Sequence, residues 1–580
     1  MKPFFYLRSS FLLLILSTPI LAQQVTDLIA PEAGTSKQDK TSVKAQNYIA
    51  VTAHPLATQA AYDVLKQGGN AIDAMVTAQT VLGLVEPQSS GLGGGAFLVY
   101  YDAKSKRLTT FDGRETAPAK APIDLFMADD QTPLDFFDAV VGGRSVGTPG
   151  TVKLLWNIHQ KYGHLDWKKL LTPATSLANH GFEVSARLAN AIKNDRTRLT
   201  SDATTASYFL PEGKALEAAQ TLKNQAYADT LSLLAIKGGD YFYSADYSET
   251  ITKKVQQSSN PGYLSTQDFE QYKVIERTPT CSRYREYNIC GMGPPSSGAI
   301  TVSQTLGMLE NRDMSKMSPD NAKTWHIISE ASRLAFADRG LYIADPDFVN
   351  LPSGLLSKSY LKNRAQLINE NLSSKTISAG QPPALTAYQF RQGRSPEQDS
   401  TSHFVMVDRE GNIVSMTSTI ENGFGSRLMV NGFLLNNELT DFSFVPTENG
   451  KRIANSVEAG KRPRSSMAPT IVFKGDEPYL AIGSPGGSRI INYVSNSLIA
   501  LLDWNYPLQA ALDMPHIVNR FGTMDVEVNT KASGLVNDFK TLGYQISERD
   551  LNSGLHAVMF TKNGMIGAAD NRREGTVLGD

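Results

Sequence analysis

The sequence predicts an α+β protein in which helices pack on layered β-sheets. The segment from about 150 to 380 follows a mostly helical periodicity with short interruptions. After residue 401 the pattern changes to alternating strands joined by short, glycine-containing turns. Because helical and strand-like segments occur in both halves of the chain, we expect sheets that are covered by helices.

Bulk composition sets outer limits on function. The chain has 580 residues, 41% of them hydrophobic and 19% charged, with a formal net charge of −1. One hydrophobic core stops growing well below this length, so length alone suggests several domains. The balanced charge gives no indication of a nucleic-acid partner or of binding to an anionic membrane surface.

Residues 1–22 have the pattern of a secretory signal peptide. Lys2 and Arg8 supply positive charge, residues 11–16 are apolar, and Ala22 is a small residue suited to cleavage after it. The apolar run is too short to cross a bilayer, and an uncleaved anchor at the membrane surface is the alternative. No later segment has 18 consecutive apolar residues. We therefore expect an exported protein, secreted or periplasmic, with no membrane attachment after signal cleavage.

The first elements expected in the mature chain are two helices and a strand. One helix runs from Pro55 to a stop at Gly68, and a second covers residues 71–84. The glycine-rich run 91–95 then leads into a strand at 97–101. The run matches a dinucleotide-binding fingerprint by letter, but that motif requires a strand before it and a helix after it. Close backbone packing is the better interpretation of these glycines.

The middle of the chain carries further helices, at residues 152–162, 167–180, 186–194 and 322–337. Residues 375–400 are rich in Pro, Gly, Gln and Ser and are expected to form a flexible arm. Cys281 and Cys290 flank an expected hairpin, so in an oxidising compartment we expect a disulfide between them. Two cysteines without a histidine cluster make a poor zinc site, and no metal is expected.

Thr401 stands where a polar, loop-like run ends and the first of several hairpins begins. The expected strands and one buried helix lie at residues 402–407, 413–420, 470–473, 479–482, 489–504 (the helix), 557–560 and 565–568. A cut before Thr401 would make this threonine a new N-terminus. Its α-amino group titrates near pH 8 and lies beside its own hydroxyl, so it can act as the base and no separate histidine is required.

Motifs in a fixed order along the chain carry a family resemblance. One group follows the expected cut: Thr401-Ser402-His403, Gly411-Asn412, Thr417-Ser418-Thr419-Ile420-Glu421 and Phe424-Gly425. Others lie on both sides of it, at residues 68–74, 91–97, 114–118, 147–150, 294–298, 435–442, 461–467 and 483–489. Together, from about residue 48 to 575, they resemble the γ-glutamyltransferases (γ-glutamyl transpeptidase, glutathione hydrolase).

This resemblance implies an N-terminal-nucleophile hydrolase fold, a four-layer αββα sandwich formed by two fragments of one self-cleaved precursor. The cut falls between Ser400 and Thr401, which leaves a large subunit (23–400) and a small subunit (401–580) joined as a heterodimer. The implied substrates are glutathione and other γ-glutamyl compounds, and the implied acceptors are water, amino acids and dipeptides. No metal or organic cofactor is implied.

The same resemblance implies roles for individual residues. Thr401 is the nucleophile, Thr419 hydrogen-bonds to it, and Gly486 and Gly487 provide N–H groups for an oxyanion hole. The binding residues divide by charge. Arg114, Ser465 and Ser466 bind the substrate α-carboxylate, for which a guanidinium fork is suited. Glu421, Glu438 and Asp441 face the α-ammonium.

Each of these residues also has a plainer interpretation. Thr401 and Thr419 are ordinary strand threonines, Arg114 forms a structural ion pair with Glu115 or Asp112, and the glycines and serines form simple turns. Two departures from the family pattern are Val405, where Ser or Thr is usual, and Glu421, where many members have Asn. The connection from Phe442 to Lys461 is intermediate in length for a lid over the pocket, and Phe444 is its one aromatic residue.

Three rival functions remain open at this stage. Gly143-Arg144-Ser145-Val146-Gly147 fits a nucleophile elbow, with a strand-like segment at 138–141 before it and His516 or His556 as base. A glutaryl or cephalosporin acylase would keep the fold but need less of the ammonium pocket. An exported binding protein on an inactive scaffold would stay uncut.

Overall fold

Two seven-stranded sheets form the centre of the computed structural model, which describes residues 37–383, 388–393, 395 and 400–580. In spatial order the first sheet contains β23 (Thr576–Gly579), β2 (Ile49–Thr52), β10 (Thr401–Val407), β11 (Ile413–Thr419), β3 (Gly95–Asp102), β4 (Arg107–Gly113) and β7 (Ile275–Arg277). The second contains β1 (Val43–Ala45), β22 (Gly564–Ala569), β21 (His556–Thr561), β17 (Glu477–Gly483), β16 (Thr470–Lys474), β9 (Tyr287–Gly291) and β8 (Thr280–Tyr284).

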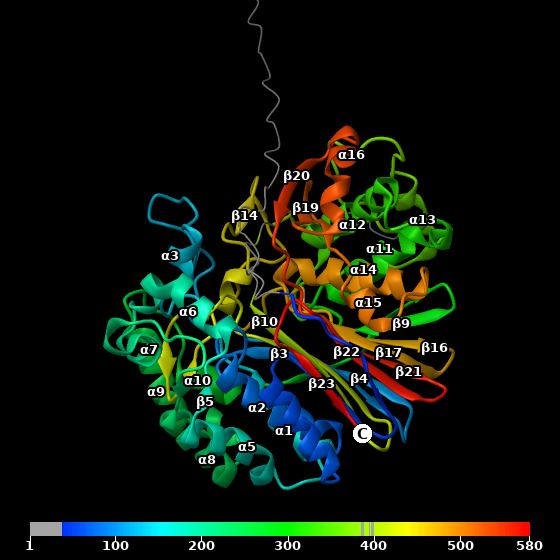
Figure 1. Ribbon diagram of the computed structural model, residues 1–580. Helices are drawn as coiled ribbons and strands as arrows, with labels where there is room; N and C mark the ends of the chain where they lie inside the picture. The colour runs from blue at the N-terminus through cyan, green and yellow to red at the C-terminus, as the bar shows by residue number, and fades with distance from the viewer. Residues whose placement is uncertain (1–36, 384–387, 394, 396–399) are drawn as a thin grey trace, which may run out of the picture.

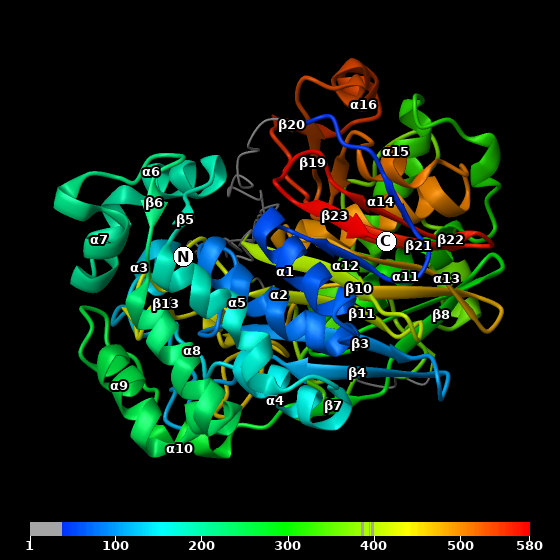
Figure 2. The same cartoon turned by 60° about the horizontal axis from the view of Figure 1, so that its bottom comes forward.

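Helices cover the outer face of each sheet (Figures 1 and 2). On the first sheet lie α1 (Pro55–Lys66), α2 (Ala71–Val85), α4 (Thr151–Tyr162), α5 (Trp167–His180) and α8 (Gln225–Lys237). On the second lie α11 (Gly298–Leu309), α12 (Ala322–Tyr342), α14 (Ile490–Leu502) and α15 (Leu508–Leu512). The remaining helices of the described part are α3 (Phe136–Val140), α6 (Ala186–Leu199), α7 (Ala203–Phe209), α9 (Ala245–Gln256), α10 (Thr266–Gln271), α13 (Lys358–Ala365) and α16 (Val536–Thr541).

Three apolar cores correspond to the three interfaces between four layers. One contains Phe404 and Met406 with residues of α2 and α5, and another contains Ile482 with residues of α11, α12 and α14. Between the sheets, Val405 and Val407 pack with Val558 and others. Since alternate side chains of a strand point to opposite faces, β10 is buried on both sides. The predicted αββα sandwich is confirmed.

The strand register sets the position of Thr401. It is the first residue of β10 and pairs with Thr419, the last residue of β11, which in turn pairs with Gly95 at the start of β3. By alternation, Thr401 lies on the face of β10 that carries Val405, the face turned to the second sheet. The N-terminal end of β10 therefore opens between the two sheets.

Most predicted elements agree with the structure to within a few residues. The disulfide between Cys281 and Cys290 is present, across the β8–β9 hairpin as predicted. The strand expected at 138–141 is wrong, because Phe136–Val140 form the short helix α3. The predicted signal peptide lies outside the described residues, as do parts of the predicted arm. None of the helices in the described ranges combines the length and the apolarity needed to span a bilayer.

Candidate active site

Two threonine hydroxyls and the Ser400 carbonyl meet at the start of β10. Thr401 Oγ1 lies 3.4 Å from Thr419 Oγ1. The Thr419 hydroxyl donates to the Ser400 carbonyl oxygen at 2.7 Å and accepts from the Glu421 N–H at 2.8 Å. The peptide bond expected to break thus receives a hydrogen bond at its carbonyl. Both threonines are 3% exposed.

The glycine-rich run before β3 packs closely against the backbone of Thr419. A Cβ on Gly94 would come within 2.0 Å of the Thr419 carbonyl oxygen, and one on Gly93 within 2.2 Å of the Leu434 carbonyl oxygen. Only glycine permits backbones to approach this closely. The packing interpretation of this run is confirmed.

A second pair of glycines forms the turn between β17 and α14. Gly486 and Gly487 have φ of +127° and +54°, values that side chains with a Cβ rarely adopt. Gly487 lines the same pocket as Thr401. Gly486 is one residue away from the lining, and a Cβ on it would come within 2.7 Å of the ring of Tyr493. A turn of this kind presents backbone N–H groups to an anion.

Arg114, on the loop after β4, is fully surrounded by acceptors. Its guanidinium forms ion pairs with Glu438 and with Asp441, the latter at 2.5 Å, and donates to the carbonyl oxygens of Pro463 and Arg464. From Arg114, Asp112 accepts a hydrogen bond only from the backbone N–H, and the Asp112 side chain pairs with Arg277 instead. The expected alternative, an ion pair with Asp112 or Glu115, is therefore not what the structure shows. Arg114 meets the residues expected to bind the other end of the same substrate.

Carboxylates outnumber cations in this part of the pocket. Burial raises the pKa of Glu438 well above its usual range, although Arg114 opposes the shift. Burial likewise raises the pKa of Glu115, directly behind Arg114, to about 8. Burial lowers the pKa of Arg114, but Glu438 and Asp441 outweigh it and the net shift is upward. The pocket is thus short of positive charge, a condition that a bound ammonium would relieve.

The remaining predicted binding residues, Glu421, Ser465 and Ser466, are buried and each takes part in a hydrogen bond. Asn437 Nδ2 donates to Glu421 Oε2 at 2.5 Å. Ser465 Oγ accepts from the Met467 N–H at 3.2 Å, and Ser466 Oγ accepts from Arg339 Nη2 at 2.7 Å. Glu421 has a positive φ of 76°, which turns the chain away from β11 toward the pocket.

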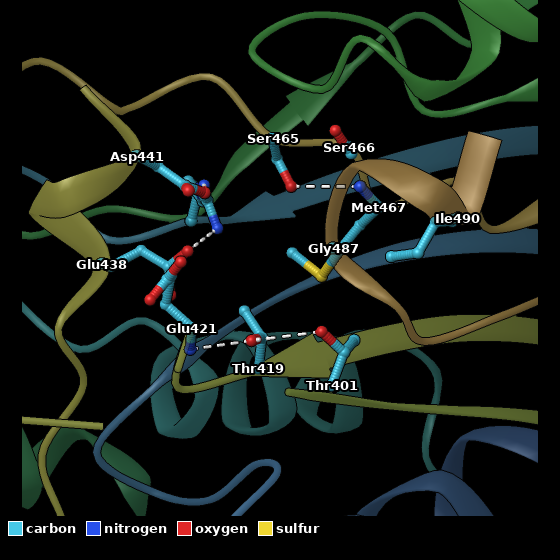
Figure 3. A pocket seen from close by; sticks show the side chains of 11 residues that line it. Thr401, Thr419, Glu421, Glu438, Asp441, Ser465, Ser466, Met467, Gly487 and Ile490 are labelled. Carbon is cyan, nitrogen blue, oxygen red and sulfur yellow. Dashed lines mark hydrogen bonds and ion pairs between the residues drawn. The ribbon is translucent and has the colours of Figure 1, made fainter. Parts of the chain in front are cut away.

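One pocket collects these side chains (Figure 3). Its lining is Arg114, Thr401, Thr419, Glu421, Glu438, Asp441, Ser465, Ser466, Met467, Gly487 and Ile490. Figure 3 shows Glu438 and Asp441 on one side of the opening and Thr401 on the other, with Thr419 and Glu421 between them. Sequence reasoning missed Met467 and Ile490. Isolated apolar residues carry no signal that separates a pocket wall from a core.

Two other features of the sequence lie away from this pocket. Phe444, the one aromatic of the 442–461 connection, stacks on Phe126 at 4.7 Å between ring centroids and does not cover the pocket. Ser145 of the elbow-like motif is buried, and its hydroxyl donates to the Val140 carbonyl oxygen. Of the two candidate bases, His516 contacts Ser553 and His556 stacks on His403, and neither contacts Ser145. The elbow alternative therefore lacks both its strand and its base.

Known proteins resemble this chain over most of its length. The model of the gamma-glutamyltranspeptidase family matches residues 57–580. The glutathione hydrolase proenzyme of Bacillus subtilis (strain 168) is 38% identical over 544 residues, which cover 91% of this chain and 90% of that protein. The glutathione hydrolase proenzyme of Escherichia coli (strain K12) is 35% identical over 541 residues, or 91% of each chain.

A solved structure agrees with the fold. The cephalosporin acylase from Bacillus halodurans superposes with a TM-score of 0.81 at 24% identity, covering 95% of this chain and 98% of that one. At this identity the likeness concerns the fold alone. The family match, by contrast, runs through every segment that lines the pocket, from Arg114 to Ile490. With that match and the identity to its relatives, the chain belongs to the gamma-glutamyltranspeptidase family.

Proposed function

We propose that this protein is a γ-glutamyltransferase and glutathione hydrolase that uses Thr401 as its nucleophile. It would convert glutathione and water to glutamate and cysteinylglycine, or pass the γ-glutamyl group to an amino acid or dipeptide. One observation carries the proposal: a hydroxyl nucleophile and a set of opposed charges line the same small pocket. The Bacillus subtilis and Escherichia coli relatives are glutathione hydrolase proenzymes, which supports it.

Maturation would begin with attack of Thr401 Oγ1 on the carbonyl carbon of Ser400. The C–N bond breaks as the new C–O bond forms, and water then hydrolyses the ester. The products are a large subunit ending at Ser400 and a small subunit beginning at Thr401. The hydrogen bond from Thr419 to the Ser400 carbonyl oxygen would stabilise the negative charge that develops there.

Turnover would repeat this chemistry on the substrate. The free α-amine takes the hydroxyl proton as Oγ1 attacks the γ-carbonyl carbon, and gives that proton to the departing amine. Water or an acceptor amine then attacks the acyl-enzyme. Backbone N–H groups at Gly486 and Gly487 would hold the oxyanion.

Substrate binding would replace the ion pairs within the pocket by two new sets, one to the α-carboxylate of the substrate and one to its α-ammonium. The α-carboxylate of the glutamyl group competes with Glu438 and Asp441 for the Arg114 fork, while its α-ammonium takes over those two carboxylates. Glu421 adds a further acceptor, and the hydroxyls of Ser465 and Ser466 add donors to the carboxylate. A zwitterion satisfies both sides of this exchange. A glutaryl group has no ammonium, so it would leave the buried carboxylates without a replacement cation.

The proposed location is outside the cytoplasm. It rests on the signal-like pattern of residues 1–22 and on the disulfide between Cys281 and Cys290, which an oxidising compartment would maintain. Isolation of the periplasmic fraction, with sequencing of the mature N-terminus, tests both the location and the cleavage after Ala22.

The central test is mass analysis of the purified protein with Thr401→Ala beside it. The wild type should run as two chains, the smaller beginning with Thr401, whereas Thr401→Ala should remain one inactive chain. Ser402→Ala is the matched control, because Ser402 points to the opposite face of β10, toward Glu86, and should still be cut. A wild type that releases glutamate as one unbroken chain would overturn the proposal.

A second assay separates the acylase alternative. Rates with γ-glutamyl and glutaryl anilides are compared on the same wild-type preparation. We expect the γ-glutamyl compound to have the higher kcat/KM by at least about a hundredfold, the value of one buried charge pair. Equal rates would favour the acylase.

A further inference from the structure

Arg573 reaches the nucleophile from the far end of the chain. It lies four residues after β22, is 1% exposed, and its Nη1 donates to the carbonyl oxygen of Thr401 at 3.3 Å. Neither the sequence motifs nor the mechanism above uses this contact. It places a guanidinium on the residue whose hydroxyl and future α-amine are proposed to do the chemistry.

Hydrogen bonds and close packing hold the Arg573 side chain in one position. Its Nε donates to Asn552 Oδ1 and its Nη2 to the Asn552 carbonyl oxygen, both at 3.2 Å. Gly554 has a φ of +80°, and a Cβ there would come within 2.5 Å of Arg573 Cδ. Lys40 Nζ donates to the Arg573 carbonyl oxygen at 2.5 Å. The guanidinium is therefore fixed in place before any substrate arrives.

Thr401 needs an additional contact because its strand is supported on one side only. Along β10, pairing with β11 begins at Thr401, but pairing with β2 begins only at Val405. After the cut, Thr401 would lose its covalent link to Ser400 and become a strand terminus, the kind of position that frays. The Arg573 hydrogen bond is then the restraint on its carbonyl from the side opposite β11.

The guanidinium charge also affects the new α-amine. Covalent geometry places the amine about 4–6 Å from the group that contacts the carbonyl oxygen of the same residue. A like charge at this range disfavours the protonated amine. The same cation contributes to lowering the pKa of His556 to about 3, although burial is the larger cause there.

Other charged and titratable groups surround the same end of β10. Glu421 follows β11. Glu86 follows α2 and is paired with Arg187 of α6. His403 of β10 and His556 of β21 stack below Thr401. Burial lowers the pKa of both imidazoles, so they are neutral at pH 7. Arg573 is the one of these cations that contacts Thr401 directly.

We propose that Arg573 is a positioning residue that fixes the terminal Thr401 and keeps its α-amine unprotonated at neutral pH. The proposal rests on the function proposed above, since it requires the cut that frees the amine. No bond forms or breaks at Arg573. Its side chain acts only through a hydrogen bond to the Thr401 carbonyl oxygen and through its charge.

The test is the pH profile of kcat/KM for the cut enzyme, which reports groups of the free enzyme. In Arg573→Met we expect the acid limb to move up by about one pH unit, so that the loss of activity is about tenfold greater at pH 6 than at pH 9.5. Arg573→Lys keeps the charge but cannot span Thr401 and Asn552 together. It should retain the wild-type acid limb with a kcat lowered about threefold to tenfold.

Arg333→Met is the matched control. Arg333 of α12 is also a buried arginine. Its partners, Glu330 and the Ser374 carbonyl oxygen, do not line the pocket. It should leave the acid limb unchanged. A limb that stays at the wild-type pH in cut Arg573→Met overturns the proposal. If Arg573→Met is not cut, a shifted limb in Arg573→Lys overturns it instead. Either result leaves the role of Thr401 intact, which the two-chain analysis tests separately.

Discussion

The two ends of the pocket are built from different kinds of side chain. The hydroxyl end, Thr401, Thr419 and the Gly486–Gly487 turn, contains neutral donors fixed by strand register and by glycine packing. The ionic end combines Arg114, on the loop after β4, with Glu438 and Asp441 of a short 3-10 helix, and it is held by the ion pairs themselves. We therefore expect that bond breaking and substrate selection can be altered separately. Rigid strands position the groups that break the bond, whereas exchangeable ion pairs select the substrate.

Arg114→Lys should have the largest effect on activity. The effect should be limited to the ionic end of the pocket. A lysine cannot form a fork with two carboxylates and two carbonyls, so we expect kcat/KM for a γ-glutamyl anilide to fall about a hundredfold to a thousandfold. The cut before Thr401 should remain complete on a denaturing gel. Arg107→Lys, at the exposed start of β4, provides the control and should behave as wild type. Loss of the cut in Arg114→Lys would show that the two ends are not separable.

Thr419→Val should impair the hydroxyl end of the pocket by slowing the cut before Thr401. It removes the donor to the Ser400 carbonyl oxygen while keeping the shape of the side chain. We expect cutting to slow by about a hundredfold, the cost of one oxyanion donor, as followed by the appearance of the small subunit over time. Thr417→Val is matched to it on the same face of β11, where the hydroxyl contacts His403. If both variants were cut at equal rates, the Thr419 hydrogen bond would have no role in maturation.

Glu421→Gln should have a smaller effect on activity. It tests a residue that lies between the two ends of the pocket. Glu421 touches both ends, since its N–H donates to Thr419 and its carboxylate faces the pocket. Removing its charge should lower the preference for γ-glutamyl over glutaryl anilides about tenfold with little change in cutting. Glu410→Gln, in the exposed turn of the same hairpin, should leave the preference unaltered. An unchanged preference in Glu421→Gln would remove this residue from recognition.

Low pH should lower the free energy of unfolding, because histidines are buried beneath the hydroxyl end. Burial lowers the pKa of His556 and of His516 to about 3, and that of His403 well below its usual value. These groups are neutral when folded but take up protons near pH 6.5 when unfolded. Their contribution is therefore complete above pH 6.5 and is lost as pH falls toward 3, at up to about 1.4 kcal/mol per pH unit for each histidine.

Urea unfolding from pH 8 to pH 4 measures this slope. His403→Gln should reduce it, because a glutamine takes up no proton in either state. His164→Asn, at an exposed position, is the control and should retain the wild-type slope. A slope that is the same in all three proteins would contradict the assignment to buried imidazoles.

Local pattern was sufficient for the hairpins and for the position of Thr401 at the start of a strand. Strand alternation and turn residues place Thr401 and Thr419 at one end of a two-stranded unit, since antiparallel register follows from a short turn. The glycine run 91–95 was also assigned correctly, because the order of elements around it excludes a phosphate site. The segment at 138–141 was not, since four apolar or short residues fit a strand and a helical turn equally well.

The sequence by itself determined the alternating strands, the disulfide hairpin and, through its ordered motifs, most of the residues that line the pocket, with Met467 and Ile490 as the exceptions. Tertiary structure alone decided which of them touch. The pairing of Arg114 with Glu438 and Asp441 joins residues more than 300 positions apart, and the contact of Arg573 with Thr401 joins residues 172 positions apart. Periodicity reports only neighbours within a few residues, whereas these contacts depend on how two sheets and their loops close around one opening.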